Sequence, residues 1–434
     1  MIAILLAMSE TLAFAQDTNP IAPPPVQDVQ MMEIPPSAPH VNDYGYVIVP
    51  GWNLGMTADV LGVYDTNPAF LLQPIGDVAQ RYSGSASVSY LAKHTVYQAA
   101  YLPSFSYYRK FTTLNSDEQS LNQTFWHESS PRTNFSWRLN AHEYPSWGGS
   151  SFASSAFGSL LMELSGLTAL NLESKVKSAT TGLTLVHELN RRSHFQADIS
   201  GGVTKYVHSN SDQFVSLLTA PDSSTWSAQT SFFYYRQLSA HRSLGAGVSA
   251  AYFLFTFQDS RLMVQSAMLR YSEVLRKNWA YSVSIGPDLR EDQHSSKKIQ
   301  PGLNLDVDLV HKTKKTAFRA SVVNAYQTGA AEGNLTSWVA LVSFERSVGK
   351  RGFAGVFATY LRSESEFSQG ALGKGTTQSM TPAVDGGIRL TRHLVWFANY
   401  GFGLQEGALT LQNKIYRQQF LSGISFNVDR LLPR

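Results

Sequence analysis

The sequence predicts an all-β fold: an up-and-down antiparallel transmembrane β-barrel of about 18 strands, with 16 strands as the alternative. Three observations lead to this prediction. Short basic turns recur along the chain. Two extended segments, and usually one longer and more polar loop, lie between neighbouring turns. The extended segments alternate large apolar residues with small or polar ones, which is typical of strands with one face toward lipid.

The basic turns are spread over most of the chain, and most are followed within a few residues by an aromatic residue or a leucine. They are Lys93-His94, Ser130-Pro131-Arg132, Asn190-Arg191-Arg192-Ser193, Ala240-His241-Arg242, Arg276-Lys277-Asn278, Lys312-Thr313-Lys314-Lys315, Gly349-Lys350-Arg351-Gly352 and Thr391-Arg392-His393.

The composition agrees with a membrane barrel. Charged residues make up 15% of the 434 residues and aromatic residues 12%. Such a chain can present apolar side chains to lipid and Tyr or Trp to the interfaces. The chain has no cysteine, which excludes a disulfide framework, a thiolate nucleophile and a sulfur metal site. The net charge of +3 is too small to indicate nucleic-acid binding.

The N-terminal residues predict export. Residues 1–15 have the pattern of a signal peptide, with a short apolar stretch before Ala13-Phe14-Ala15. Residues 16–50 are Pro-rich and predict an extended periplasmic tail. We assign 51–426 to the barrel and 427–434 to a C-terminal tail. No segment approaches the roughly 20 apolar residues that a membrane helix needs, so a barrel remains the way to cross a bilayer.

Alternation and turn residues together define the strand candidates. They are 55–64, 82–92, 95–108, 119–128, 133–141, 178–189, 194–207, 226–238, 243–258, 261–275, 278–288, 300–311, 316–327, 335–346, 352–361, 380–390, 394–404 and 414–426. An even count puts both chain ends on one side. The basic turns then lie on that side, which we expect to be the periplasm, and the longer connections lie outside.

Polar residues on the inner face of the strands are the candidate site. By alternation, the residues expected to line the lumen are Arg138, Asn140, Asp198, Asn304, Asp306, Asp308, Arg319, Asn324, Asp385, Arg389 and Asn399. As a set they suggest a lumen that selects solutes. For any single residue, ion pairing that stiffens the wall is the favoured interpretation, because buried charges need partners.

Aromatic residues recur beside the basic turns. The first outward residue after a turn is often aromatic, which predicts an interfacial girdle on the outer face. Its expected members are Phe135, Phe195, Trp279, Phe318, Phe353 and Trp396.

The longest loop, 142–177, contains Leu160, Leu161, Leu164 and Leu167 at a spacing that allows two turns of amphipathic helix. It would either pack on the rim, which we favour, or fold into the lumen as a constriction.

We expect no catalytic residue, no metal site and no cofactor. The pairs His127-Glu128, His142-Glu143 and His187-Glu188 lack the second histidine four residues on that a zinc protease needs. Gly370 to Thr376 has the wrong spacing for a phosphate loop, and no Gly-x-Ser-x-Gly occurs.

Three short motifs carry a resemblance. Gly62-Val63-Tyr64-Asp65-Thr66-Asn67-Pro68 resembles the Tyr-Asp-x-Asn signature of a broad family of Gram-negative outer-membrane β-barrel proteins. Tyr101-Leu102-Pro103 before Tyr107-Tyr108, and the turn Ser130-Pro131-Arg132, are similar to the same family. The resemblance could cover residues 51–426. Some members are encoded beside exopolysaccharide export systems, so it implies a link to polysaccharide, and it carries over no catalytic residue. From the residues alone, Asp65 and Asn67 are turn residues before a proline.

The sequence therefore predicts a non-enzymatic protein of the cell outer membrane with both termini in the periplasm. The first hypothesis is a passive channel for hydrophilic solutes or an exported polysaccharide. The alternative is a non-transporting surface protein whose external loops bind glycan or a partner, and a soluble periplasmic β-protein is the weakest hypothesis. The expected partners are outer-membrane lipid, the barrel assembly machinery and polysaccharide, with no nucleic acid.

Overall fold

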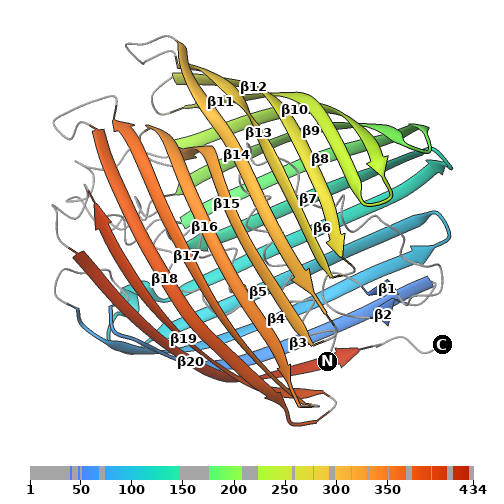
Figure 1. Ribbon diagram of the computed structural model, residues 1–434. Helices are drawn as coiled ribbons and strands as arrows, with labels where there is room; N and C mark the ends of the chain where they lie inside the picture. The colour runs from blue at the N-terminus through green and yellow to red at the C-terminus, as the bar shows by residue number, and fades with distance from the viewer. Residues whose placement is uncertain are drawn as a thin grey trace.

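The chain folds into one closed antiparallel barrel of 18 strands, β3 to β20, each hydrogen-bonded to its neighbours in sequence, with β20 pairing back to β3 (Figure 1). This computed structural model describes residues 40–41, 47–48, 51–67, 74–145, 175–207, 223–256, 260–276, 278–292, 299–313, 315–329, 333–349, 351–367, 374–391, 393–407 and 414–429. The predicted fold class and the predicted count of about 18 strands are both confirmed.

The strands are long and tilted. The barrel consists of β3 (Gly51–Asp65), β4 (Asp77–Ala92), β5 (Thr95–Tyr108), β6 (Ser116–Ser130), β7 (Thr133–Pro145), β8 (Lys175–Asn190), β9 (Ser193–Val207), β10 (Ser223–Ser239), β11 (Arg242–Phe255), β12 (Ser260–Arg276), β13 (Trp279–Asp292), β14 (Ile299–Lys312), β15 (Thr316–Gly329), β16 (Gly333–Val348), β17 (Gly352–Phe367), β18 (Lys374–Arg389), β19 (Leu394–Gly407) and β20 (Lys414–Asp429). A small sheet joins β1 (His40–Val41) to β2 (Val47–Ile48), and a 3₁₀ turn, η2 (Thr112–Leu114), follows β5.

Each basic turn joins two neighbouring strands at the end of the barrel where β3 begins and β20 ends; we call this the short-turn end. The longer connections join strands at the opposite, long-loop end. The expected signal peptide and most of the Pro-rich tail lie outside the described residues. The last strand runs to Asp429, so it includes the first residues that we had assigned to the C-terminal tail. No described helix is long and apolar enough to cross a membrane.

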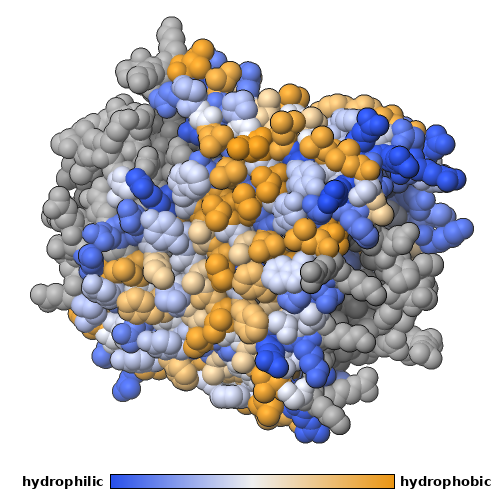
Figure 2. All heavy atoms as spheres, viewed as in Figure 1, coloured by the Kyte–Doolittle hydropathy of each residue, from blue (hydrophilic) through white to orange (hydrophobic). Residues whose placement is uncertain are grey.

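The two faces of the wall differ in chemistry. Residues opposite each other in an antiparallel pair share a face, so the register sorts every strand position into an inner or an outer set. The outer set contains exposed apolar side chains such as Val60, Trp226 and Leu269. Figure 2 shows apolar residues gathered in a band across the middle of the visible face, with hydrophilic residues on both sides of it. Alternation in the sequence thus becomes an apolar belt outside and a mostly polar wall inside.

Most strands extend farther at the long-loop end than the sequence pattern indicated, although β11 ends at Phe255 where 258 was expected. β17 and β18 were expected to span 352–361 and 380–390, yet their ladder continues to the pair Glu366–Lys374. The added residues are polar on both faces. Alternation of apolar and polar residues, which was the signal used, ends where the apolar belt ends. The backbone pairing does not end there, because hydrogen bonds of the ladder need no apolar face.

Candidate functional site: the inner wall of the barrel

Small polar side chains dominate the inner wall. On β4, Ser83, Ser85, Ser87 and Ser89 follow one another on the inner face, and the last three are buried. Short hydroxyl side chains leave room inside a barrel and offer both donors and acceptors of hydrogen bonds. The inner wall is therefore suited to water and to hydroxylated or charged solutes.

The register places most of the predicted lumen residues on this inner wall. They are Arg138 and Asn140 on β7, Asp198 on β9, Asn304, Asp306 and Asp308 on β14, Arg319 on β15, Asp385 and Arg389 on β18, and Asn399 on β19. Alternation was sufficient to assign these residues, because the opposite face of each strand is clearly apolar.

Asn324 differs from the prediction. It pairs with Leu305 and Trp338, which share the outer face, and it is nevertheless 5% exposed. We had assigned it inward because it is polar, although its position alternates with that of Arg319. The strand register, and not the polarity of a single residue, determines which face a residue occupies.

Phe353 also differs from the prediction. It was expected in the outer girdle as the first aromatic residue after a basic turn. Its register partner is Gly387 on the inner face, and a Cβ added at Gly387 would overlap the Phe353 ring. β17 carries apolar residues on both faces, so its alternation was ambiguous. Phe135, Phe195, Trp279, Phe318 and Trp396 do lie on the outer face.

Ion pairs connect several strands across the inner wall. Arg319 Nε donates to Asp308 Oδ1 at 2.7 Å, and Arg81 Nη2 lies 3.1 Å from Glu118 Oε2. Arg81 Nε also donates to Ser104 Oγ at 2.8 Å. These residues stand on adjacent or near-adjacent strands, so each contact fixes the wall locally. The stiffening role that we favoured for individual inward charges stays a prediction.

An aromatic stack lies against the wall between β10 and β12. A Cβ at Gly245 would meet the Tyr235 ring at 2.6 Å, and one at Gly247 would overlap the Phe233 ring. Both rings therefore lie flat over a glycine of β11. The Arg270 guanidinium lies 5.3 Å from the centre of the Phe233 ring, and its Nη1 donates to the Tyr235 hydroxyl at 2.8 Å. Glycine on one strand thus lets its neighbour's large side chain lie along the wall.

Several inward carboxylates have no ion pair with a described base. They include Asp59 on β3, Asp306 on β14, Glu345 on β16 and Asp385 on β18. Glu345 and Asp385 are both opposite Gly355, which has no side chain to separate them. A Cβ at Gly355 would overlap the Asp385 carboxylate. The described part of the inner wall thus carries more carboxylates than arginines.

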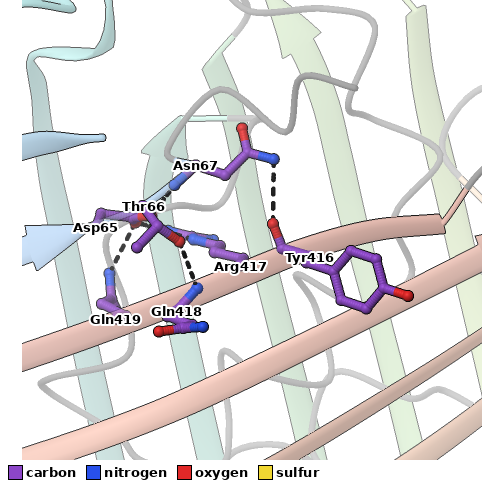
Figure 3. Close-up of polar contacts among 7 residues, drawn as sticks. All are labelled: Asp65, Thr66, Asn67, Tyr416, Arg417, Gln418 and Gln419. Atoms are coloured by element: carbon purple, nitrogen blue, oxygen red, sulfur yellow. Dashed lines mark hydrogen bonds and ion pairs between the residues drawn. The ribbon is translucent and has the colours of Figure 1, made fainter. Parts of the chain in front are cut away.

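The seam between the first and last barrel strands has the densest polar network (Figure 3). Arg417 donates from Nε and Nη2 to Asp65 Oδ2 at 2.9 and 2.6 Å. Gln419 Nε2 donates to the same oxygen at 3.2 Å, and the Asn67 backbone N–H donates to Asp65 Oδ1 at 2.9 Å. Asp65 is fully buried and Arg417 is 5% exposed. We call Asp65, Asn67, Arg417 and Gln419 the seam network.

Backbone contacts continue the seam network beyond the end of β3. The Thr66 N–H donates to the Gln418 carbonyl at 2.9 Å, and the Gln418 N–H donates to Thr66 Oγ1 at 2.8 Å. Asn67 Nδ2 donates to the Tyr416 carbonyl at 3.2 Å. The Tyr-Asp-x-Asn motif is thus more than a turn before a proline. It holds the two ends of the barrel together, and only the register of residues far apart in the chain could reveal this.

The β5–β6 connection, residues 109–115, folds against the inner wall beside the seam. Leu114 is 1% exposed and packs with Leu61, Val63 and Leu421, all on inner positions. The backbone N–H groups of Lys110 and Phe111 both donate to Asp77 Oδ2 at 2.9 Å. Sequence reasoning had treated this segment as an external loop. For the 142–177 loop it had favoured packing on the rim, with a constriction of the lumen as the alternative. Residues 146–174 of that loop lie outside the described residues.

A closed antiparallel barrel with an apolar outer belt and a polar inner wall defines the class: a transmembrane β-barrel. No family model matches the chain, and no curated protein matches it. The chain is similar in fold to the ferric enterobactin receptor PfeA of Pseudomonas aeruginosa (8% identity, 88% of this chain and 81% of that chain covered, TM-score 0.44). It is also similar to the copper transporter OprC (10%, 87% and 80%, TM-score 0.45). A third is OccK2 (OpdF) of Pseudomonas aeruginosa in complex with glucuronate (10%, 88% and 98%, TM-score 0.44). At these identities the likeness concerns the fold alone.

Proposed function

We propose that the protein is a passive channel of the Gram-negative outer membrane for hydrophilic solutes. The observation that carries the proposal is the mostly polar inner wall beneath an apolar outer belt. A barrel of this strand number encloses a lumen wide enough for solutes unless chain fills it. Both chain termini would lie in the periplasm with the short turns.

The solute class follows from the wall. Serine hydroxyls and paired charges favour polar solutes, and the unpaired carboxylates favour cations over anions. An exported polysaccharide is the finer version of this proposal, and the resemblance of the Tyr-Asp-x-Asn motif supports it. Sugar hydroxyls would find both donors and acceptors among the inner serines.

The β5–β6 connection would narrow the channel at its long-loop mouth. Asp77 fixes it by accepting two backbone N–H groups, and Leu114 fixes it by packing on the inner wall. Replacing Asp77 by Ala should loosen the connection, so the conductance should become noisier and larger. Val78→Ala is the matched control, because Val78 lies on the outer face of the same strand and is 48% exposed. Equal conductance in the two variants would show that the β5–β6 connection does not narrow the channel.

One observation favours the alternative, a surface protein without transport. Several inner residues are almost fully covered, such as Ser337 at 0%, Thr359 at 1% and Phe253 at 1% exposure. Cover of this extent on separate parts of the wall is expected if chain fills part of the lumen. A filled barrel would expose its loops for binding glycan or a partner and would conduct no ions.

Single-channel recording of the refolded protein in a planar bilayer separates the two functions. Stable conductance steps would support the channel, and exclusion of polymers of increasing size would then measure its width. A correctly folded barrel that migrates differently when unheated on a gel, yet stays silent in the bilayer, would contradict the channel and favour the surface protein.

A further inference from the structure

Exposed basic side chains are concentrated at the short-turn end of the barrel. Those with described, exposed side chains are Lys93, Arg132, Arg191, Arg192, Arg236, Arg242, Lys312, Lys315, Arg346 and Arg351. We call these residues the basic rim. Carboxylates with described side chains at this level are fewer: Glu273 on the outer face and, at inner positions, Glu128, Glu188, Glu345 and Asp385. The basic rim therefore has an excess of positive charge.

Three lysines on the outer face at the long-loop end are arranged differently. Lys175 Nζ lies 2.6 Å from Asp117 Oδ1, and Lys177 Nζ lies 3.4 Å from Glu143 Oε2. Lys414 Nζ lies 3.5 Å from Glu406 Oε2. Each of these bases has a carboxylate of the same barrel beside it. The charge of these three lysines is thus balanced within the protein. In the basic rim, Arg242 alone lies beside a described carboxylate, Glu273, so most of the rim charge needs partners from outside.

The depth of the basic rim is fixed by a cluster on the outer face of β11 to β13. The hydroxyls of Tyr271 and Tyr281 donate to Glu273 Oε2 at 2.8 and 3.0 Å, and Arg242 Nε donates to Oε1 of the same carboxylate at 2.8 Å. Tyrosine hydroxyls on the surface of a membrane protein lie where the bilayer meets water. Arg242 therefore lies at the level of lipid headgroups.

We propose that the basic rim binds the phosphate groups of anionic phospholipids, of the phosphatidylglycerol type, in the leaflet at the short-turn end. The proposal rests on the membrane placement proposed above. Rim bases occur at the turns after β4, β6, β8, β10, β14 and β16, so they surround much of the barrel. A ring of charge at headgroup depth matches a lipid annulus, whereas a docked protein would need one charged face.

Brominated lipids test this proposal, because they quench the fluorescence of tryptophans that they contact. Trp279 and Trp396 lie on the outer face next to basic turns. The protein would be reconstituted in phosphatidylcholine with either brominated phosphatidylglycerol or brominated phosphatidylcholine. We expect preferential quenching by phosphatidylglycerol of at least about fivefold, since one base near an anionic surface contributes about 1 kcal/mol. High salt should reduce the preference.

Two matched triple variants decide where the preference arises. Arg191→Gln, Arg192→Gln and Arg236→Gln together should remove most of it, because none of these three bases has an ion pair with a described carboxylate. Lys175→Gln, Lys177→Gln and Lys414→Gln together should leave it unchanged, because those bases are already paired. Heat-modifiable migration on gels would verify that both variants fold. An equal loss in both variants, or no preference in the unmodified protein, would overturn the proposal.

A third arm replaces phosphatidylglycerol by lipopolysaccharide, whose phosphates belong to the other leaflet. Preference for lipopolysaccharide alone, lost in the rim variant, would overturn the assignment to phospholipid and with it the periplasmic placement of the short turns. Channel activity is measured separately in neutral phosphatidylcholine bilayers. Failure of the lipid proposal and failure of the channel proposal are therefore distinguishable.

Discussion

The seam network shows how much depends on single residues in this barrel. Asp65 receives hydrogen bonds from Arg417, Gln419 and the Asn67 backbone while it is fully buried. A buried charge without its partner is far more costly than the pair is favourable. The network is thus a place where one substitution can open the barrel.

Asp65→Asn should destabilise the folded barrel by about 3–5 kcal/mol, because it leaves the Arg417 guanidinium buried without its counter-charge. The measurement is the urea concentration at which the heat-modifiable band disappears. Adding Arg417→Met to Asp65→Asn should recover part of the loss, since no unpaired charge then remains. Additive losses in the double variant would show that the two residues do not act as a pair.

Glycines on the inner wall also matter at the scale of single residues, because they leave room for large side chains of the neighbouring strand. Gly247→Val should push the Phe233 ring off the wall and lower the conductance of an open channel, because the ring then enters the lumen. Gly62→Ala is the control: Gly62 lies on the outer face, and the nearest atom to an added Cβ is 3.9 Å away. Unchanged conductance in Gly247→Val would mean that the ring finds room against the wall.

At the scale of elements, the sequence was sufficient to predict the order of the strands and which connections lie at the same end of the barrel. It was not sufficient to predict the length of the strands. The strand ends that border a basic turn agree closely with the expected bounds, because the turn residues mark them. Long-loop ends run farther, as β17 shows: its outer-face residues change from Val356 and Tyr360 to Glu364 and Glu366. The change marks the upper edge of the apolar belt. The fold of the β5–β6 connection was equally invisible, because Leu114 packs on residues from both ends of the chain.

Cysteine labelling tests where the belt ends, and the natural absence of cysteine makes the experiment clean. Glu364→Cys should react rapidly with a membrane-impermeant maleimide in reconstituted vesicles. Val356→Cys, on the same face of the same strand, should react slowly because lipid covers it. Similar rates at the two positions would place the belt elsewhere on β17.

At the scale of the whole molecule, the inner wall differs from both ends of the barrel in its balance of positive and negative side chains. Inner arginines are paired with carboxylates in Arg319–Asp308, Arg81–Glu118 and Arg417–Asp65, and additional carboxylates remain. The sequence listed both signs without showing which charges were compensated. Ion pairing depends on which strands are neighbours and on the register between them. Alternation of residues along one strand reveals neither the neighbours nor the register.

An open channel should therefore prefer potassium to chloride. The reversal potential in a potassium chloride gradient measures this preference, and Glu345→Gln with Asp385→Asn should shift it toward chloride. Asp308→Asn is not a suitable control, because Arg319 would lose its partner. Glu364→Gln, at an outer position, is the better one. A reversal potential that favours chloride in the unmodified channel would contradict the charge balance described here.

The pairing of β20 with β3 has a consequence for chain order. The wall is an unbroken ring, so any short turn could in principle serve as its beginning. A permuted chain in which 429 is joined to 51 and a new break is made at the β10–β11 turn would trace the same ring. The seam would then be an ordinary hairpin, formed early by neighbours in sequence. Asp65 and Arg417, now 352 positions apart, would no longer have to find each other last.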